Sequence, residues 1–138
     1  MADIIITIGD TRLPAIFEEA LAPRTCARFR AMLPYRERLI HVRWSGEACW
    51  IPMGDFDVEL PPENATSYPA PGQIILYPSG VSETEILVGY GNVCFASKAG
   101  QLAGNHFLTI TEGVDLLPGI GREILWGGAK PIVFEAAS

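Results

Sequence analysis

The segment HVRWSGEACWIP, residues 41–52, decides the fold that the sequence predicts. Around it, from residue 39 onward, apolar and polar side chains alternate, which is the period of a β-strand with one buried face. Ser45 and Gly46 supply a tight turn, and the run EACWIP follows with further β-forming residues. The segment therefore predicts a hairpin with strands over residues 39–44 and 47–52.

Short β-forming runs continue on both sides of this hairpin. Near the start of the chain, DIIITIGDTRLPAIF reads as two strands joined at the turn pair Gly9-Asp10. Downstream, QIILYP, EILVGYG, HFLTITEG and PIVFEA are further short runs with turn residues between them. Strands are thus predicted over residues 4–8, 13–17, 39–44, 47–52, 73–76, 85–90, 106–111 and 132–135.

Two segments have helical character. In APRTCARFRAML, Pro23 suits a first helical turn and apolar residues recur at spacings of three and four, which predicts a helix over residues 23–32. VDLLPGIGREIL is a weaker helical segment, interrupted by a proline and two glycines. About eight strands and two helices without regular βαβ alternation favour an antiparallel barrel or sandwich capped by helices. We expect one domain over residues 1–138.

Composition narrows the possible partners. The net charge of −6 argues against nucleic acid, whose binding draws affinity from clustered Lys and Arg. No apolar run approaches the roughly 18 residues needed to cross a bilayer, and MADIIITIGD lacks the basic flank of a leader, so we expect a cytoplasmic protein. Hydrophobic residues make up 49%, more than one small barrel needs to bury, which predicts a homo-oligomer. Its contact is expected at Trp126 or near Ser45-Gly46.

Few residues suggest metal or cofactor chemistry. The three cysteines form no C-x-x-C pair, and nothing in the spacing of the two histidines requires them to meet. GYGN and GIGRE lack the strand, turn and helix context of nucleotide-binding loops. We therefore predict neither a metal nor a cofactor, and whether the chain catalyses a reaction stays open.

The order of motifs resembles that of the cyclophilins. Pro23, Thr25 and Phe29 match the pattern of the first cyclophilin helix, and FASKAGQLAGNHFLTI looks like the glycine-rich stretch that runs into a phenylalanine-rich strand. A closer resemblance is to bacterial and archaeal cyclophilin-like families of unknown function. It rests on WSGEACW at 44–50, Glu63-Asn64 before a Pro-Gly turn, and YPSG at 77–80. The resemblance implies an all-β fold: a cyclophilin-like closed eight-stranded barrel capped by two helices.

The resemblance also implies a surface groove. Cyclophilin isomerases use an arginine in a Phe-His-Arg segment with a glutamine beyond it, whereas here Arg43 follows two residues after His41 and no glutamine follows. We therefore expect a domain that binds a small molecule or short peptide without efficient isomerase activity. One alternative is a peptidyl-prolyl isomerase in which Arg43 polarises the prolyl nitrogen and Phe107 or Leu108 forms the floor. Another is an enzyme or accessory subunit acting on a small carboxylated metabolite.

The candidate groove residues come from three parts of the chain. His41 and Arg43 occupy odd positions of one predicted strand and so share a face, where the guanidinium offers a planar fork for a carboxylate or carbonyl. Glu63-Asn64 lie in a stiff, proline-rich loop that could present them to a ligand, although Asn64 could equally cap a turn. The full set of candidates is His41, Arg43, Glu47, Glu63, Asn64, His106, Phe107 and Leu108.

Overall fold

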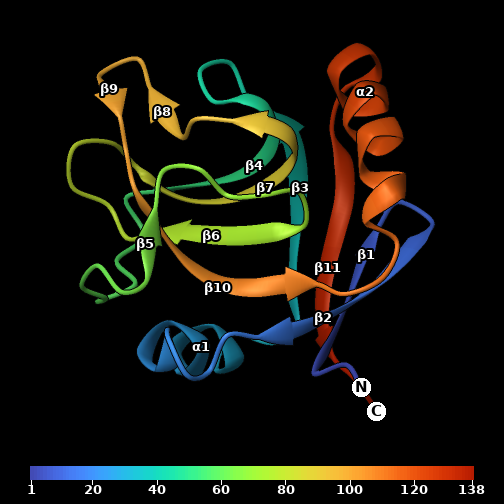
Figure 1. The fold of residues 1–138 in the computed structure, drawn as a ribbon, viewed down its shortest axis with the longest axis horizontal. Helices are drawn as coiled ribbons and strands as arrows, with labels where there is room; N and C mark the ends of the chain where they lie inside the picture. Colours follow the sequence, from blue (N-terminus) through green and yellow to red (C-terminus); the bar gives the residue numbers. More distant parts are fainter.

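The computed structural model describes residues 1–138, and its main feature is a ring of antiparallel strands (Figure 1). In chain order the elements are β1 (Ile4–Ile8), β2 (Thr11–Phe17), α1 (Pro23–Arg30), β3 (Tyr35–His41), β4 (Gly46–Gly54), β5 (Ala65–Thr66), β6 (Gln73–Tyr77), β7 (Thr84–Val93), β8 (Ala96–Ser97), β9 (Gly100–Gln101), β10 (Gly104–Ile110), a 3-10 turn at Val114–Leu116, α2 (Leu117–Gly127) and β11 (Lys130–Ala136).

The ring is closed. Its strand order is β2-β1-β11-β3-β4-β7-β6-β10, and β10 pairs back onto β2 through registers such as Leu108 with Phe17. The short strand β5 pairs with the beginning of β10 outside this ring. Closure removes the unpaired strand edges that an open sheet would expose. The predicted closed eight-stranded barrel is therefore confirmed.

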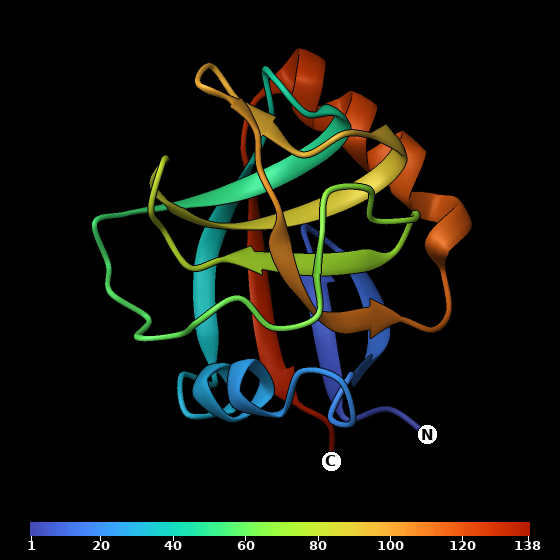
Figure 2. The ribbon, with the colours of Figure 1, turned by 60° about the vertical axis from the view of Figure 1, so that its left-hand side comes forward.

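The barrel interior holds the main hydrophobic core. Inward residues alternate with outward ones along β1, whose burial follows the period of two that the sequence shows. Helix α1 contributes Phe29, which packs edge to face against Phe107 and Phe134 with ring centroids 5.1 Å apart in both pairs. Helix α2 buries Ile120 and Ile124 in the same core. Figures 1 and 2 place the two helices at opposite ends of the barrel.

Helix α2 runs without a break through Pro118, Gly119 and Gly121, which the sequence suggested would interrupt it. Pro118 lies in the first turn, where its missing N–H costs nothing. A Cβ on Gly121 would lie 2.3 Å from the Tyr90 ring, so glycine lets the helix approach β7 closely. No helix in the structure combines the length and apolar character needed to cross a membrane.

A second, smaller core lies on the outer face of the barrel. Strand β7 is buried on both sides, because Ile86 and Val88 face the interior while Leu87 faces outward. The outward cluster is covered by the segment that follows β7, which includes the β8–β9 hairpin and contributes Phe95 and Leu102. Both ribbon views show this hairpin outside the ring (Figures 1 and 2). The barrel therefore has a covered flank as well as a filled interior.

The hairpin over residues 39–52 differs from its prediction. Strands β3 and β4 do pair, with Ile40 opposite Trp50, but β3 ends at His41, so the predicted Ser45-Gly46 turn between strands reaching Trp44 is wrong. Beyond His41 the chain leaves the sheet, and the hydroxyl of Ser45 forms two hydrogen bonds with the backbone of Ala96 in the outer layer. The connection thus forms part of the covered flank.

Candidate ligand pocket

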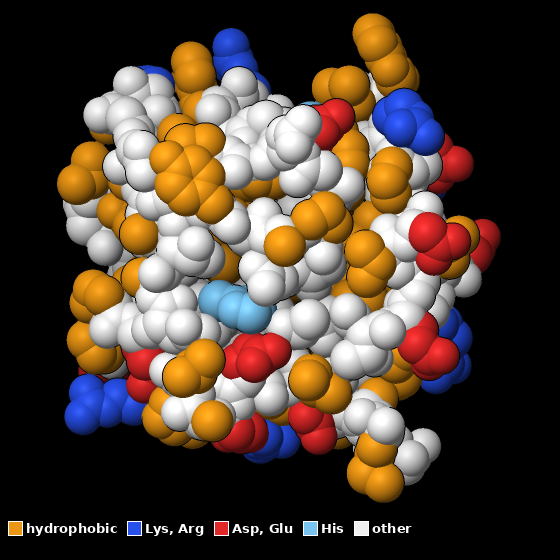
Figure 3. Space-filling view, in the orientation of Figure 1, with side chains coloured by type: hydrophobic (Ala, Val, Ile, Leu, Met, Phe, Trp, Pro, Cys, Tyr) orange, Lys and Arg blue, Asp and Glu red, His pale blue; other side chains and the backbone are white.

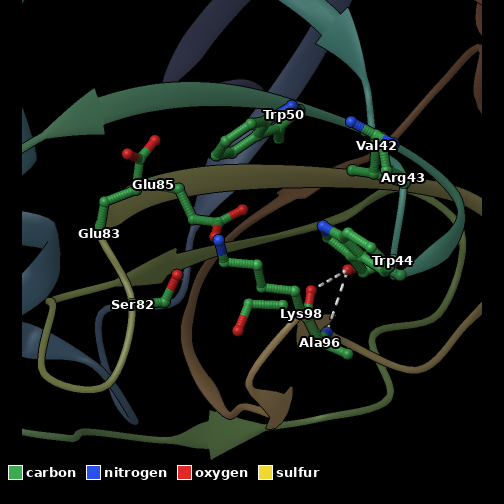
Figure 4. A pocket seen from close by; sticks show the side chains of 11 residues that line it. Val42, Arg43, Trp44, Trp50, Ser82, Glu83, Glu85, Ala96 and Lys98 are labelled. Carbon is green, nitrogen blue, oxygen red and sulfur yellow. Dashed lines mark hydrogen bonds between the residues drawn. The ribbon is translucent and has the colours of Figure 1, made fainter.

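A pocket of about 240 Å³ opens at the edge of the covered flank (Figure 4). Its walls come from the loop after β3, from β4, from the start of β7 with the loop before it, and from β8 with the turn that follows it. Two tryptophans, two cations and two carboxylates dominate its lining: Trp44, Trp50, Arg43, Lys98, Glu83 and Glu85.

Hydrogen bonds to backbone hold two of these walls in place. Ser45 Oγ donates to the carbonyl of Ala96 and accepts from its N–H, both at 3.0 Å, which joins the loop after β3 to β8. The Tyr77 hydroxyl accepts from the N–H groups of Val81 at 3.0 Å and Ser82 at 3.4 Å, which fixes the loop before β7. The pocket is therefore largely preformed, as small-molecule sites usually are.

The aromatic part of the pocket is unusually open to solvent. Trp44 is 54% exposed, whereas Trp50 is half-buried against the outer core. The Arg43 guanidinium lies 5.5 Å from the Trp44 ring centroid, within range of a cation–π interaction. A large apolar ring next to a cation suits contact with a flat ligand that carries a negative charge.

Glu85 is the buried ionisable group of the pocket. Its residue is only 6% exposed, yet its carboxyl group forms no hydrogen bond or ion pair within the protein. Burial, and secondarily the negative charge of Glu83, raises the pKa of Glu85 to about 8, so the group is mainly protonated at neutral pH. Figure 4 shows its side chain pointing into the pocket, while Lys98 extends from the opposite wall.

The structure separates the residues that the sequence grouped as a groove. Only Arg43 lines the pocket; because β3 ends at His41, these two residues do not share a strand face. His41 instead hydrogen-bonds the Tyr90 hydroxyl through Nε2 at 2.8 Å. Glu47 accepts from the N–H of Asn92 at 2.8 Å and stabilises the end of β7. The structure therefore does not bring His41 and Glu47 into the pocket that Arg43 lines.

Glu63 is tied into the scaffold. Its Oε1 accepts from the N–H and the hydroxyl of Thr25 at 2.8 and 2.7 Å, and Oε2 accepts from the N–H of Arg24 at 3.1 Å. Desolvation would raise the pKa of Glu63, but these hydrogen bonds and the Arg24 charge outweigh it and lower the pKa. The fully buried Asn105 completes the network by accepting from the Glu63 N–H and donating to Thr25 Oγ1. Glu63 therefore stabilises helix α1.

Asn64 and His106 bind each other. Asn64 Nδ2 donates to the carbonyl of His106 at 3.0 Å, and the N–H of His106 donates to the carbonyl of Asn64 at 3.1 Å. The His106 ring contacts Thr109 Oγ1 at 2.8 Å, and this hydroxyl donates to Glu18 at 2.5 Å. Burial lowers the pKa of His106 despite the nearby Glu18 carboxylate. These residues join β10 to its neighbours and lie outside the pocket.

Phe107 and Leu108 are fully buried. A register shift in β10 between His106 and Leu108 leaves Phe107 without a partner on β6, and its ring enters the core beside Phe29. Both side chains therefore belong to the core, and neither lines the pocket. No three His, Cys, Asp or Glu side chains gather where they could hold a metal ion.

Sequence reasoning missed most of the pocket. Glu83, Glu85 and Lys98 come together only because the β8–β9 hairpin folds back over the outer face of the barrel. One signal was available: Glu85 begins the run EILVGYG, whose other residues suggest burial on both faces. A lone carboxylate in such a strand marks a polar site within a buried layer.

Comparisons with known proteins agree with the architecture. A family model described as "Protein of unknown function (DUF3830)" matches residues 4–136. Among solved structures, "Structure of McbB in complex with tryptophan" is similar with a TM-score of 0.75 and 15% sequence identity, over 98% of this chain and 45% of that chain. This chain thus spans less than half the length of that protein, and the likeness shows the fold. No curated protein matches.

Proposed function

The chain belongs to the DUF3830 family of proteins of unknown function, and we propose that it binds a small organic molecule between Trp44 and Trp50. The observation that supports this most is the convergence of two tryptophans and four ionisable side chains on one preformed pocket. Apolar walls with a few convergent polar groups are typical of ligand sites. At about 240 Å³ the pocket lies below the roughly 300–1,000 Å³ of common sites, which favours a metabolite-sized ligand.

Arg43 and Lys98 indicate a carboxylate as one group of this ligand. Arg43 presents a planar fork of N–H donors beside the exposed ring of Trp44, and Lys98 adds a mobile point charge from the hairpin. The tryptophan named for McbB is a molecule of this kind, flat and carboxylated, and the two barrels share their fold. We therefore propose a small carboxylated molecule as the ligand. The proposal rests on the side chains that line the pocket and not on the similarity to McbB.

Prolyl isomerase activity is not favoured by any contact in the structure. The proposed floor residues Phe107 and Leu108 lie inside the barrel, and Arg43 lies in the pocket on the outer flank without them. The arrangement predicted for an isomerase, with Arg43 above a floor of Phe107 or Leu108, is therefore not formed. Ligand binding without efficient isomerisation remains the proposal.

Nuclear magnetic resonance tests the proposal directly, because the chain has only three tryptophans and each gives one indole N–H signal. We would titrate the ¹⁵N-labelled protein with tryptophan and with a panel of small carboxylic acids and amines. We expect the Trp44 and Trp50 signals to shift in a saturable way, while the signal of Trp126, outside the pocket, stays in place.

A matched pair of variants completes this test. Trp44→Ala removes half of the aromatic wall and is expected to weaken binding by at least fivefold. Trp126→Ala removes an equally large indole that is 85% exposed and is expected to leave the affinity unchanged. If no compound at millimolar concentration moves the Trp44 or Trp50 signal, the pocket is not a ligand site.

A further inference from the structure

We infer that the ligand of this pocket carries a protonated amine and that Glu85 is the group that receives it. This inference rests on the proposed function and specifies its ligand class: a small zwitterion with an ammonium group, a carboxylate and a flat apolar part.

The first argument is the isolation of the Glu85 carboxyl group. Across the sheet its residue pairs with Tyr77 and Pro52, and the Tyr77 hydroxyl is already engaged by the backbone of the preceding loop. Every side-chain nitrogen or oxygen that is fully inaccessible in this structure has a hydrogen-bond partner. The unpartnered oxygens of Glu85 therefore remain accessible from the pocket. Figure 4 shows Lys98 extending toward them without forming an ion pair, so a cationic group of a ligand can still bind there.

The second argument is the distribution of charge around Glu85. Glu83 at the rim has the same sign and cannot neutralise it, Arg43 lies over Trp44, and Lys98 forms no ion pair with either carboxylate. A buried carboxylate without a counter-ion is costly, and a bound cation removes that cost. The pocket thus has an acidic position at Glu85 and basic positions at Arg43 and Lys98, which match the two ends of a zwitterion.

The third argument is the aromatic lining. Ammonium groups bind favourably near the faces of tryptophan rings, and Trp44 and Trp50 both line the pocket that Glu85 enters. Burial raises the pKa of Glu85 to about 8, so at pH 7 the empty pocket mainly holds a neutral carboxyl group. When an ammonium ion binds, the carboxyl group loses its proton to solvent and the pair forms between R-NH₃⁺ and the carboxylate.

Three indole compounds separate the groups of the ligand. Tryptophan has both the amine and the carboxylate, tryptamine has the amine alone, and indole-3-propionate has the carboxylate alone. We expect tryptophan to bind the wild type at least about tenfold more tightly than indole-3-propionate, equivalent to ~1.4 kcal/mol. In Glu85→Gln this preference is expected to fall to twofold or less, because the glutamine amide cannot lose a proton to give the negative charge that pairs with the ammonium group.

Controls and a second measurement make the test decisive. Glu112→Gln, which neutralises an exposed carboxylate outside the pocket, should retain the preference for tryptophan over indole-3-propionate. Glu85→Asp should retain part of this preference. Calorimetry at pH 7 in two buffers of different ionisation enthalpy should show proton release when tryptophan binds the wild type, and none in Glu85→Gln.

The outcomes separate the two proposals. If all three compounds bind with equal affinity and shift the Trp44 and Trp50 signals, the pocket is a ligand site but the proposed role of Glu85 is refuted. A Glu85→Gln protein that still prefers tryptophan over indole-3-propionate refutes it equally. If none of the compounds binds, the proposed function itself fails for this ligand class.

Discussion

Replacing Glu63 by glutamine should destabilise the protein through helix α1. The helix begins after Ala22 and has no side-chain cap of its own and no acidic residue in its first turn. The Glu63 carboxylate supplies both functions from another part of the chain, by accepting three hydrogen bonds from Arg24 and Thr25. Glutamine removes the negative charge. It also places an amide N–H donor opposite one of the Arg24 or Thr25 groups that donate to Glu63.

The size of the effect follows from these contacts. Loss of an N-terminal cap costs about 0.5–2 kcal/mol, and hydrogen bonds to charged groups contribute about 1.5–3 kcal/mol when buried. Glu63 is only half-buried and glutamine keeps one acceptor, so we expect a loss of about 1–2 kcal/mol. For a chain of this length that corresponds to a fall in Tm of roughly 3–8 °C.

The effect should depend on pH in a defined direction. The folded-state pKa of Glu63 lies below the usual 4.5, so the carboxylate contributes its stability above that value and loses it as the pH falls through the folded pKa. The gap in unfolding free energy between wild type and Glu63→Gln should therefore be constant from pH 6 to 8 and narrow below 4.5. Urea denaturation at pH 7 and pH 3.5 measures both quantities, with Glu112→Gln as the exposed control. A gap at pH 7 no larger than that of the control, or one unchanged at pH 3.5, would refute this assignment.

Three further predictions concern other parts of the molecule. In the native protein a thiol reagent should modify only the exposed Cys94, because burial raises the pKa of Cys26 and of Cys49 to about 12. All three cysteines should react after unfolding, and rapid labelling of a second thiol in the native protein would contradict the structure. Prolyl isomerisation of a short peptide should proceed at a small fraction of a cyclophilin's rate, and a robust rate lost in Arg43→Ala would overturn this. We propose a homo-oligomer with Trp126 at its contact, because Trp126 is exposed and Figure 3 shows hydrophobic side chains standing out over α2. Light scattering should give a mass that is a multiple of 15.0 kDa and that falls in Trp126→Ala, whereas a wild-type mass of 15.0 kDa would exclude the oligomer.

The fold was predictable where local chemistry and tertiary packing agree. The first hairpin forms across Gly9-Asp10 as predicted, and helix α1 begins at Pro23, because a turn pair and a helix-starting proline act within a few residues. The beginning of β3 was missed. Residues 35–38, YRER, show no apolar alternation, and they form a strand because β11 offers its backbone as a partner.

The candidate site was much less predictable, because its residues meet only through long-range closure. Glu63 and His106 looked like ligand residues by type, yet their hydrogen bonds serve the scaffold. Glu85 and Lys98 looked ordinary, yet both line the pocket. Residue type shows which chemistry is available, whereas the direction of a side chain depends on which strand face it occupies and on what covers that face.

The pairing of the first strand with the last has a consequence for how the chain folds during synthesis. Ile4 lies opposite Ala136 and Ile8 opposite Ile132, so the ring cannot close until residues near position 136 have left the ribosome. At about 5–20 residues per second, one edge of β1 stays without its partner for roughly 6–25 s after β1 is synthesised. A nascent chain arrested before β11 would present that edge to chaperones and proteases. Closure of the barrel therefore depends on the seven residues of β11, which pair with β1 on one side and β3 on the other.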